Sequence, residues 1–455
     1  MAKISEYLGG SAVDNVKKAI VAAKSVSKYN SLLELCEERA LDLAAKVDAG
    51  EIKGRLAGVP FVAKDNFLTL GSKTTAASHF LENFEAPLQA TAIEKLEAEG
   101  AICIGKSNLD AFAHGGSTEN SAFGPTLNAA DETRVAGGSS GGSAVATALG
   151  VVPFALGTDT GGSIRQPASF NGVVGVKPTY GMVSRYGVVA MASSTDTIGC
   201  FASCAEDAEL VMDIIAGHDD LDMTTLPDYF DPTTLDMPKR VGIIKEFMSD
   251  DVDEDVRNAT RTYATKLEAS GFTVSEVSLP MLKYTLAMYY IIVPAEISSN
   301  LARYDGVRYG VRAETNDLNE LYGKSRDQGF EAENKRRIMI GSYVLSSGFF
   351  DAYYLKAQKA RTLLINEFNK AFEDYDILMG PVSPTPAFKL GANSSDPMKM
   401  YLADIMTVGA SLAGLPAISV PAGVSADSLP IGVQLIGQRR SDALLLAVAK
   451  SQEGK

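Results

Sequence analysis

The chain has 455 residues, of which 46% are hydrophobic and 22% are charged, as is typical of a globular protein with a large core. Its formal net charge of −14 argues against tight nucleic-acid binding by this chain alone, because phosphate contacts need clustered lysines and arginines. No uncharged apolar run approaches a membrane span and the N-terminus has no signal-peptide core, so we expect a cytoplasmic protein without membrane contact.

The first predicted elements are two helices, at residues 11–29 and 31–48, the second with apolar residues at helical spacing. A third helix at 88–99 precedes an apolar strand from Ala101 to Gly105. Helices that alternate with short apolar strands indicate an α/β fold. We expect the N-terminal helices, within residues 1–49, to pack on the sheet or to receive a partner.

An apolar strand between the two helical regions delivers a lysine to its end. The segment 58–66 reads GVPFVAKDN, and Lys64 comes where the strand meets a polar turn. Strand ends that meet loops are where α/β enzymes collect catalytic groups. A lysine can act as a base when burial lowers its pKa, although a single lysine is more often an ordinary surface residue.

Two serines embedded in glycines dominate residues 135–164. Ser139 lies in the loop that opens a predicted helix at 137–150, and Ser163 ends the loop that follows a predicted buried strand at 151–156. Glycines let backbone N–H groups turn towards one point, as an oxyanion hole requires, and the two loops would face each other. Nucleotide binding is disfavoured because the GxxxxGK[ST] and GxGxxG patterns are absent. Each loop taken alone could equally be a tight turn.

The three histidines offer few candidates for a Ser-His-Asp triad. His218 lies in an acidic run and His79 in a polar loop, so we expect both at the surface. His114 precedes a glycine pair and is the histidine we place near a site. Lys64 is therefore the better candidate base.

The four cysteines are few for this length and are predicted to be buried free thiols. They are Cys36, Cys103, Cys200 and Cys204. The CxxxC pair has no second pair and no histidine nearby, so we expect no metal site.

Beyond the serines, an acidic, proline-containing stretch at 217–239 is predicted to connect a core at about 50–217 to a second lobe at about 240–455. In that lobe we predict a strand from Arg240 to Ile244, a helix at 252–270, a strand from Phe272 to Val277 and a last helix at 441–452. The whole chain, 1–455, is expected to form one domain.

Three residues of the second lobe are candidates for substrate specificity. Tyr289, Arg337 and Asp404 lie in segments that look mostly helical. An arginine and an aspartate that converge on one pocket would suit a zwitterionic amino acid, with Arg337 on the carboxylate and Asp404 on the ammonium. Each residue alone is more often a structural or surface ion-pair residue.

Three segments in fixed order, GVPFVAKDN, GGSSGGSA and DTGGSIRQPA, resemble the amidase signature family, whose members cleave carboxamides. The separations, 75 residues from Lys64 to Ser139 and 24 from Ser139 to Ser163, also agree with that family. The resemblance implies that Ser163 is the nucleophile, that Ser139 is a bridging serine after a cis peptide bond from Gly138, and that Lys64 is the base.

The same resemblance implies an α/β fold with a large central mixed β-sheet flanked by helices on both faces. It also assigns the oxyanion hole to the backbone N–H groups of Thr160, Gly161, Gly162 and Ser163. Where the family would carry methionine, this chain has His114.

Segments 298–310 and 335–339, together with VLSSGFFDAYYLKAQKARTL, are similar to one branch of the family, the A subunits of the tRNA-dependent amidotransferases, over about residues 10–450. This implies glutamine hydrolysis, with Tyr289, Arg337 and Asp404 binding glutamine. It further implies a heterotrimer with B and C subunits. Ammonia would pass to the B subunit, which would bind ATP, Mg²⁺ and most of the misacylated tRNA. We expect no cofactor or metal in this chain.

Two other functions stay open at this point. A free-standing amidase of small carboxamides would share the three catalytic segments but would need no partners. A non-catalytic scaffold protein would keep the fold alone. The choice between Glu-tRNA(Gln) and Asp-tRNA(Asn) also stays open.

Overall fold

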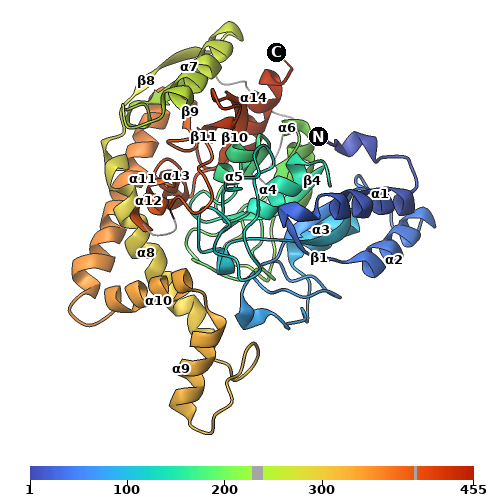
Figure 1. The fold of residues 1–455 in the computed structure, drawn as a ribbon. Coiled ribbons are helices and arrows are strands. Elements are labelled where there is room, and N and C mark those ends of the chain that lie inside the picture. Colours follow the sequence, from blue (N-terminus) through green and yellow to red (C-terminus); the bar gives the residue numbers. More distant parts are fainter. Residues whose placement is uncertain (228–238, 394–396, 455) are drawn as a thin grey trace.

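The computed structural model describes residues 1–227, 239–393 and 397–454, and one mixed sheet runs through them (Figure 1). In spatial order its eleven described strands are β1 (Leu32–Leu35), β3 (Ile102–Ser107), β2 (Pro60–Lys64), β4 (Phe154–Asp159), β6 (Thr197–Ala202), β5 (Val174–Lys177), β10 (Ala417–Val424), β11 (Pro430–Gly437), β9 (Ile377–Pro381), β7 (Arg240–Ile244) and β8 (Thr273–Val277). Parallel pairs join β2 to β3 and β4, and β7 to β8 and β9, whereas the other neighbours are antiparallel.

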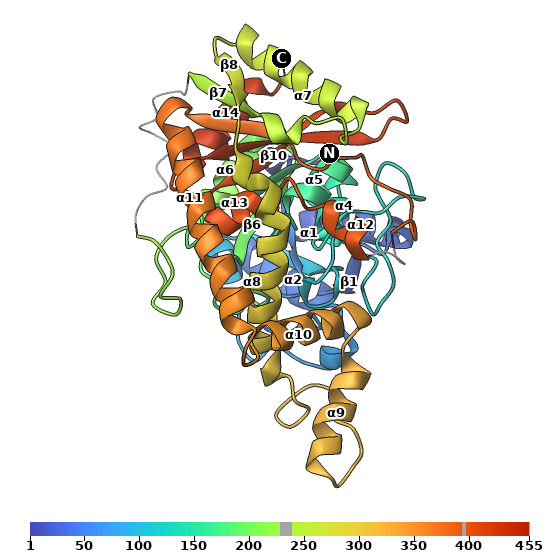
Figure 2. The same ribbon diagram turned by 90° about the vertical axis from the view of Figure 1, so that its left-hand side faces the viewer.

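Helices cover both faces of the sheet, as expected (Figures 1 and 2). One face carries α1 (Ala12–Ser25), α2 (Glu37–Asp48), α4 (Gly141–Ala148), α5 (Arg165–Asn171), α8 (Thr285–Asn300), α11 (Lys356–Asp374) and α13 (Val408–Ala413). The other carries α3 (Thr91–Ala98), α6 (Ala205–Ile215), α7 (Glu254–Ala269) and α14 (Asp442–Gln452). The remaining described helices are α9 (Leu318–Gly329), α10 (Ala332–Val344) and α12 (Pro397–Leu402).

Side chains of the central strands point alternately to the two faces of the sheet, and apolar side chains are buried on both. In β2, Phe61 and Ala63 join the core on one face, whereas Val62 joins the core on the other, and all three are fully buried. Each large apolar side chain removed from water in this way contributes about 1.5–3 kcal/mol of stabilisation. A strand covered on both sides therefore carries Lys64, at its end, into a dry environment.

The predicted helix at 31–48 is wrong at its start. Residues Leu32–Leu35 form the edge strand β1, which pairs antiparallel with β3, and the helix begins only at Glu37. The leucine spacing is compatible with a helix, but the unpaired edge of β3 offers backbone partners that local spacing does not reveal. The first helix also ends early, at Ser25, and a short 3₁₀ turn follows it.

The predicted strand at 151–156 lies three residues further along, at Phe154–Asp159. Pro153 has no N–H to donate to a neighbouring strand, so pairing starts after it. The strand continues through polar residues because β6 pairs with it as far as Asp159. The predicted elements at 88–99, 240–244, 252–270, 272–277 and 441–452 are confirmed to within about three residues.

The two regions expected on either side of residues 217–239 contribute strands to the same sheet, through the pairing of β5 with β10. Residues 228–238 of that stretch lie outside the described residues. Residues 217–227, which precede them, are held against the rest of the fold, because Asp219 accepts hydrogen bonds from Thr91 and Ser184. In Figure 2, α8 and α11 run side by side, α10 crosses at their lower end, and α9 projects beyond it.

All four cysteines are buried free thiols, as predicted. Across the described ranges, the structure contains no helix whose length and apolar character would suit a bilayer crossing. The same residues bring no three His, Cys, Asp or Glu side chains together in an arrangement that would hold a metal ion.

Candidate active site

Lys64 lies at the end of the central strand β2 and is completely buried. Its Nζ contacts three hydroxyl groups, those of Ser139 at 2.8 Å, Ser140 at 2.8 Å and Thr158 at 2.9 Å. The sequence had predicted the proximity of Lys64 and Ser139, which are 75 residues apart. It had not identified Ser140 or Thr158, because no local pattern separates a hydroxyl that faces the lysine from one that merely lines a turn.

Burial lowers the pKa of Lys64 to about 7, against the opposing influence of the carboxylates of Asp110, Asp159 and Asp196. The charged ammonium loses its hydration in this position, and hydroxyl groups replace water only in part. A lysine with such a pKa is neutral in a large fraction of molecules at neutral pH. It therefore has a lone pair with which to accept a proton.

The hydrogen-bond pattern distinguishes the two adjacent serines. Ser140 Oγ donates to the Thr158 carbonyl at 3.1 Å, so its hydroxyl can only accept from Lys64. A neutral amine has two hydrogens and one lone pair. If the hydrogens go to Ser140 and Thr158, the lone pair remains for the hydroxyl proton of Ser139. Ser139 is thus the serine placed to exchange a proton with Lys64.

Ser139 is held by its backbone on both sides. The peptide bond between Gly138 and Ser139 is cis, as the family resemblance implied. The Gly138 N–H donates to Oε1 of Gln166 at 2.9 Å, and the Ser139 carbonyl accepts from the N–H of Asp110 at 3.2 Å. These contacts fix the side chain of Ser139 beside Lys64.

The loop that carries Ser163 faces the loop that carries Ser139, as predicted. The N–H of Ser140 donates to the Ser163 carbonyl at 3.2 Å. Ser163 keeps 8% of its surface exposed, whereas Lys64 and Ser139 have none. Within the described residues the Ser163 hydroxyl has no hydrogen-bond partner. The site therefore has a sealed interior at the lysine and one hydroxyl open to an incoming molecule.

A buried ion pair that sequence analysis missed fixes the Ser163 loop. Asp159 and Arg165 are both fully buried, and the Arg165 Nε and Nη2 donate to the carboxylate at 3.0 Å. Arg165 also donates to the Thr407 carbonyl at 3.0 Å and to Ser411 Oγ at 2.9 Å. Burial pushes the pKa of Asp159 upward, but the Arg165 guanidinium outweighs it and holds that pKa below its usual range.

The predicted oxyanion hole needs one correction. The Gly162 N–H donates to Oδ1 of Asp159 at 2.8 Å, so this donor is already used within the loop. Gly162 has a φ of +142°, and a Cβ there would overlap Thr407. Glycine is therefore required at this position for the shape of the loop. The N–H groups of Thr160, Gly161 and Ser163 remain the candidates for the hole.

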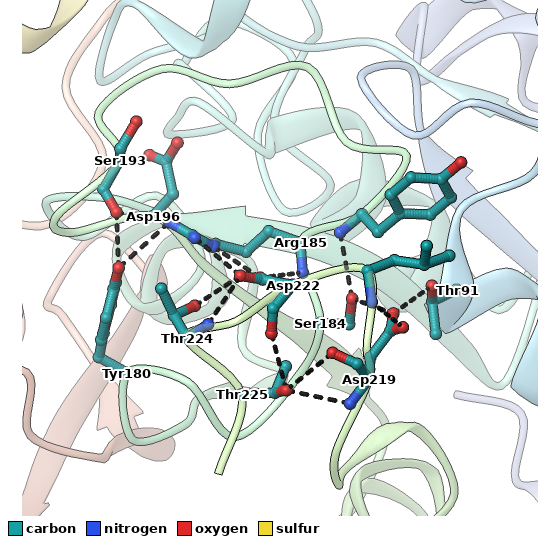
Figure 3. A network of polar contacts seen from close by, with 12 residues as sticks. Thr91, Tyr180, Ser184, Arg185, Ser193, Asp196, Asp219, Asp222, Thr224 and Thr225 are labelled. Atoms are coloured by element: carbon teal, nitrogen blue, oxygen red, sulfur yellow. Dashed lines mark hydrogen bonds and ion pairs between the residues drawn. The ribbon is translucent and has the colours of Figure 1, made fainter.

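A second carboxylate supports the loop from its other side. Asp196 Oδ1 accepts from the Thr160 hydroxyl at 2.7 Å. Figure 3 shows Asp196 beside a polar network in which Arg185 binds Asp222 through two nitrogens, each at 2.9 Å, and also reaches the Ser193 carbonyl. Arg185 thus joins the surface turn near residue 222 to Ser193, which precedes Asp196 by three residues.

Two of the predicted specificity residues, Tyr289 and Asp404, lie against glycines of the loops around the site. The Tyr289 ring, on α8, lies against Gly161, where an added Cβ would be 2.6 Å from the tyrosine hydroxyl. Asp404 lies in the turn between α12 and α13 and not within a helix. A Cβ on Gly116 would be 3.6 Å from its Oδ1. Burial raises the pKa of Asp404 to about 7, and the charge of Arg337 opposes that rise.

Arg337, on α10, is 4% exposed and faces a cavity of about 210 Å³. Its Nε donates to Glu333 Oε1 at 2.8 Å, and its guanidinium lies 5.3 Å from the Tyr290 ring centre and 5.7 Å from that of Tyr401. Its two terminal nitrogens make no hydrogen bond to the described residues. The aromatic rings thus fix the plane of a guanidinium whose outer edge is open to an anion.

Of the three histidines, only His114 is near the site, as expected. It is fully buried and belongs to the wall of the same cavity. His79 and His218 are exposed. A Ser-His-Asp arrangement at Ser163 is therefore not formed.

Comparison with known proteins gives three related findings. Residues 14–446 match the protein family described as Amidase. The glutamyl-tRNA(Gln) amidotransferase A subunit of Thermosynechococcus vestitus is 53% identical over 434 residues, which are 93% of this chain and 90% of that protein. The protein of the same name from Carboxydothermus hydrogenoformans is 51% identical, over 97% of this chain and 93% of that protein. A crystal structure of the glutamyl-tRNA(Gln) amidotransferase A subunit from Thermotoga maritima is 40% identical, with a TM-score of 0.82, and covers 99% of this chain and 94% of that chain.

The stabilising role of the buried pair of Asp159 and Arg165 can be tested by substitution. Arg165→Met should lower the free energy of unfolding by about 3–5 kcal/mol, because the carboxylate would stay buried without its cation. Chemical denaturation followed by circular dichroism measures this loss. As a matched control, Lys324→Gln removes an exposed i,i+4 pair with Glu320 and should leave the midpoint nearly unchanged. Equal midpoints for the Arg165 variant and the parent would contradict the structural role given to this pair.

Proposed function

This chain belongs to the amidase family, and from that membership and its site we propose that it is the glutamine-hydrolysing A subunit of a tRNA-dependent amidotransferase. The observation that carries the proposal is a buried lysine–serine pair beside the glycine-rich loop of Ser163, to which the segment of Asp404 is joined through Thr407. Arg337 lies at a neighbouring cavity, whose wall includes Gly116 beside Asp404. The identity of 53% and 51% to two proteins that carry the name of this subunit supports the same conclusion.

Acylation begins when Ser163 Oγ attacks the side-chain amide carbon of glutamine. Its proton passes to Ser139, whose own proton is taken by neutral Lys64. The negative oxygen of the tetrahedral intermediate is stabilised by the N–H groups of Thr160, Gly161 and Ser163. Lys64 and Ser139 then return a proton to the leaving nitrogen, the C–N bond breaks, and ammonia departs from a glutamyl ester on Ser163.

Deacylation reverses these roles. A water molecule attacks the ester carbon while the Lys64–Ser139 pair accepts its proton. The C–Oγ bond breaks, Ser163 regains its hydrogen and glutamate leaves. One glutamine and one water thus give one glutamate and one ammonia, and the three side chains return to their initial states.

Recognition of glutamine uses the second lobe. Arg337 pairs with the α-carboxylate through the open edge of its guanidinium. Asp404, whose carboxylate has no hydrogen bond to the described residues, receives the α-ammonium. Tyr289 packs at Gly161 and closes the space between the binding groups and the oxyanion turn.

The ammonia is used by partner subunits in this proposal. The chain works in the cytoplasm in a heterotrimer with B and C subunits, and the B subunit binds ATP, Mg²⁺ and most of the misacylated tRNA. The net charge of −14 agrees with leaving the RNA to a partner. The acceptor is Glu-tRNA(Gln), Asp-tRNA(Asn) or both, and the named relatives favour the first.

The test of this function separates glutamine hydrolysis from ammonia use. The chain assembled with its B and C subunits should convert Glu-tRNA(Gln) to Gln-tRNA(Gln) with ATP, Mg²⁺ and glutamine. Ser163→Ala or Lys64→Ala should reduce the glutamine-dependent rate by roughly 10⁴-fold or more. Either variant should keep the rate with ammonium chloride, because the B subunit is intact. Product tRNA is measured by chromatography of the released amino acid.

A parent complex that makes no product from glutamine but does so from ammonium would overturn the function proposed for this chain. A free-standing amidase would instead hydrolyse simple amides without partners. A scaffold protein would show neither activity while still assembling.

Replacement of Arg337 should weaken the binding of glutamine more than the binding of an analogue that lacks the α-carboxylate. Arg337→Ala should raise the KM for glutamine relative to that for 4-aminobutanamide, which lacks the α-carboxylate, by about 30-fold or more. Ammonia release from each substrate gives the two KM values. Because 4-aminobutanamide keeps the amide and the amine, a parallel rise for both substrates would show that Arg337 supports the fold and not the carboxylate.

The pKa values of Lys64 and Asp404 predict that the rate of glutamine hydrolysis falls as the pH is lowered. For both Lys64 and Asp404 the active form is the deprotonated one, so lowering the pH below about 7 removes both the base and the ammonium partner. The logarithm of kcat/KM for glutamine should therefore rise with a slope of about 2 towards pH 7, and Asp404→Asn should reduce that slope to about 1. Initial rates between about pH 5 and 9 measure both profiles. An unchanged slope in the variant would exclude Asp404 as a titrating group.

A further inference from the structure

His114 makes contacts that define which of its nitrogens carries the proton. The Asn334 side chain, on α10, is oriented at both ends, since its Oδ1 accepts from the Glu331 N–H and its Nδ2 donates to the Ala111 carbonyl at 2.9 Å. Nδ2 therefore faces the ring, and it also contacts Nδ1 of His114. Because an amide nitrogen can only donate, Nδ1 of the histidine is the acceptor.

The other ring nitrogen then carries a hydrogen that has no acceptor. Nε2 of His114 is completely buried and has no hydrogen-bond partner among the described residues. Buried donors are nearly always bonded in folded proteins, and an unbonded one is an exception that calls for an explanation. A ligand that brings an acceptor into the cavity would provide it.

The position of the ring indicates which acceptor that is. Asn334 and Arg337 are three residues apart on α10 and so lie on the same side of the helix. His114, Arg337 and Gly116 line the one cavity of about 210 Å³, and Gly116 lies beside Asp404. The ring of His114 and the open edge of the Arg337 guanidinium thus border the same cavity.

We propose that His114 is a specificity-determining residue that donates from Nε2 to the α-carboxylate of bound glutamine, beside Arg337. This inference rests on the proposed glutaminase function and assigns a second donor to its substrate. The carboxylate has two oxygens and several lone pairs, so it can accept from a guanidinium and an imidazole together.

A neutral ring suits this task better than a charged one. Burial and the nearby charge of Arg337 lower the pKa of His114 well below its usual range. The imidazole therefore adds a directed donor without placing a second cation next to the arginine. A methionine at this position would fill a similar volume but would have no hydrogen to donate.

The test compares two variants on two substrates in the assembled complex. His114→Met removes the donor, and His114→Gln keeps an N–H near the position of Nε2. His114→Met should raise the ratio of the KM for glutamine to the KM for 4-aminobutanamide by about tenfold or more, as expected for a hydrogen bond to a charged group. His114→Gln should recover most of that ratio. His79→Gln, at an exposed histidine, is the matched control and should leave the ratio unchanged.

Binding gives a readout that does not depend on turnover. In a Ser163→Ala background, calorimetry should show about tenfold weaker glutamine binding when His114→Met is added, provided that thermal unfolding shows both proteins folded. If His114→Met left both the ratio of the two KM values and the binding of glutamine unchanged, the inference would be overturned. An equal rise in KM for both substrates would also overturn it. If the parent complex does not hydrolyse glutamine at all, the proposed function fails and this inference fails with it. If only the inference is wrong, the parent complex is active.

Discussion

The removal of the Lys64 amine from water is the constraint on which the rest of the structure depends. A lysine exposed at a strand end would keep its proton at neutral pH and would be useless as a base. The large sheet prevents that, because β2 lies between two parallel neighbours and is covered on both faces. Three carboxylates limit this lowering of the Lys64 pKa, since Asp110, Asp159 and Asp196 each favour the charged ammonium. The pKa of about 7 is thus a balance between burial and surrounding charge.

The polar groups of the site fall into two kinds, which differ in whether the protein satisfies them. On the catalytic side, Lys64 has three hydroxyl partners and Asp159 has an arginine and backbone donors. On the substrate side, Nε2 of His114 is buried without a partner among the described residues. Fully bonded groups are held in one geometry, whereas unbonded ones are costly until a ligand arrives. This contrast is what preorganised catalysis with a selective binding pocket requires.

The sequence predicted those parts of the site that depend on local patterns. An apolar strand ending in Lys64 and two glycine-rich turns with serines are visible in the chain itself, and the structure brings them together. The role of Arg165 was not predictable in this way, because nothing near it indicates that its partners include Thr407, 242 residues away. The N–H of Gly162 was misassigned for a similar reason, since its direction is set by Asp159. Strand β1 was missed because only the edge of β3 makes Leu32–Leu35 a strand.

The division of the chain into a catalytic core and a specificity lobe does not carry over to the site. Thr407 follows Asp404 by three residues, and its hydroxyl donates to the Gly161 carbonyl at 2.6 Å while its carbonyl accepts from Arg165. The segment that offers a carboxylate to glutamine in the proposed function therefore also holds the turn of residues 160–163. A change that moved Asp404 would move Thr407 and, through it, the N–H groups beside Ser163. In the proposed function, recognition and chemistry consequently depend on one another, because residues 404–407 contribute to both.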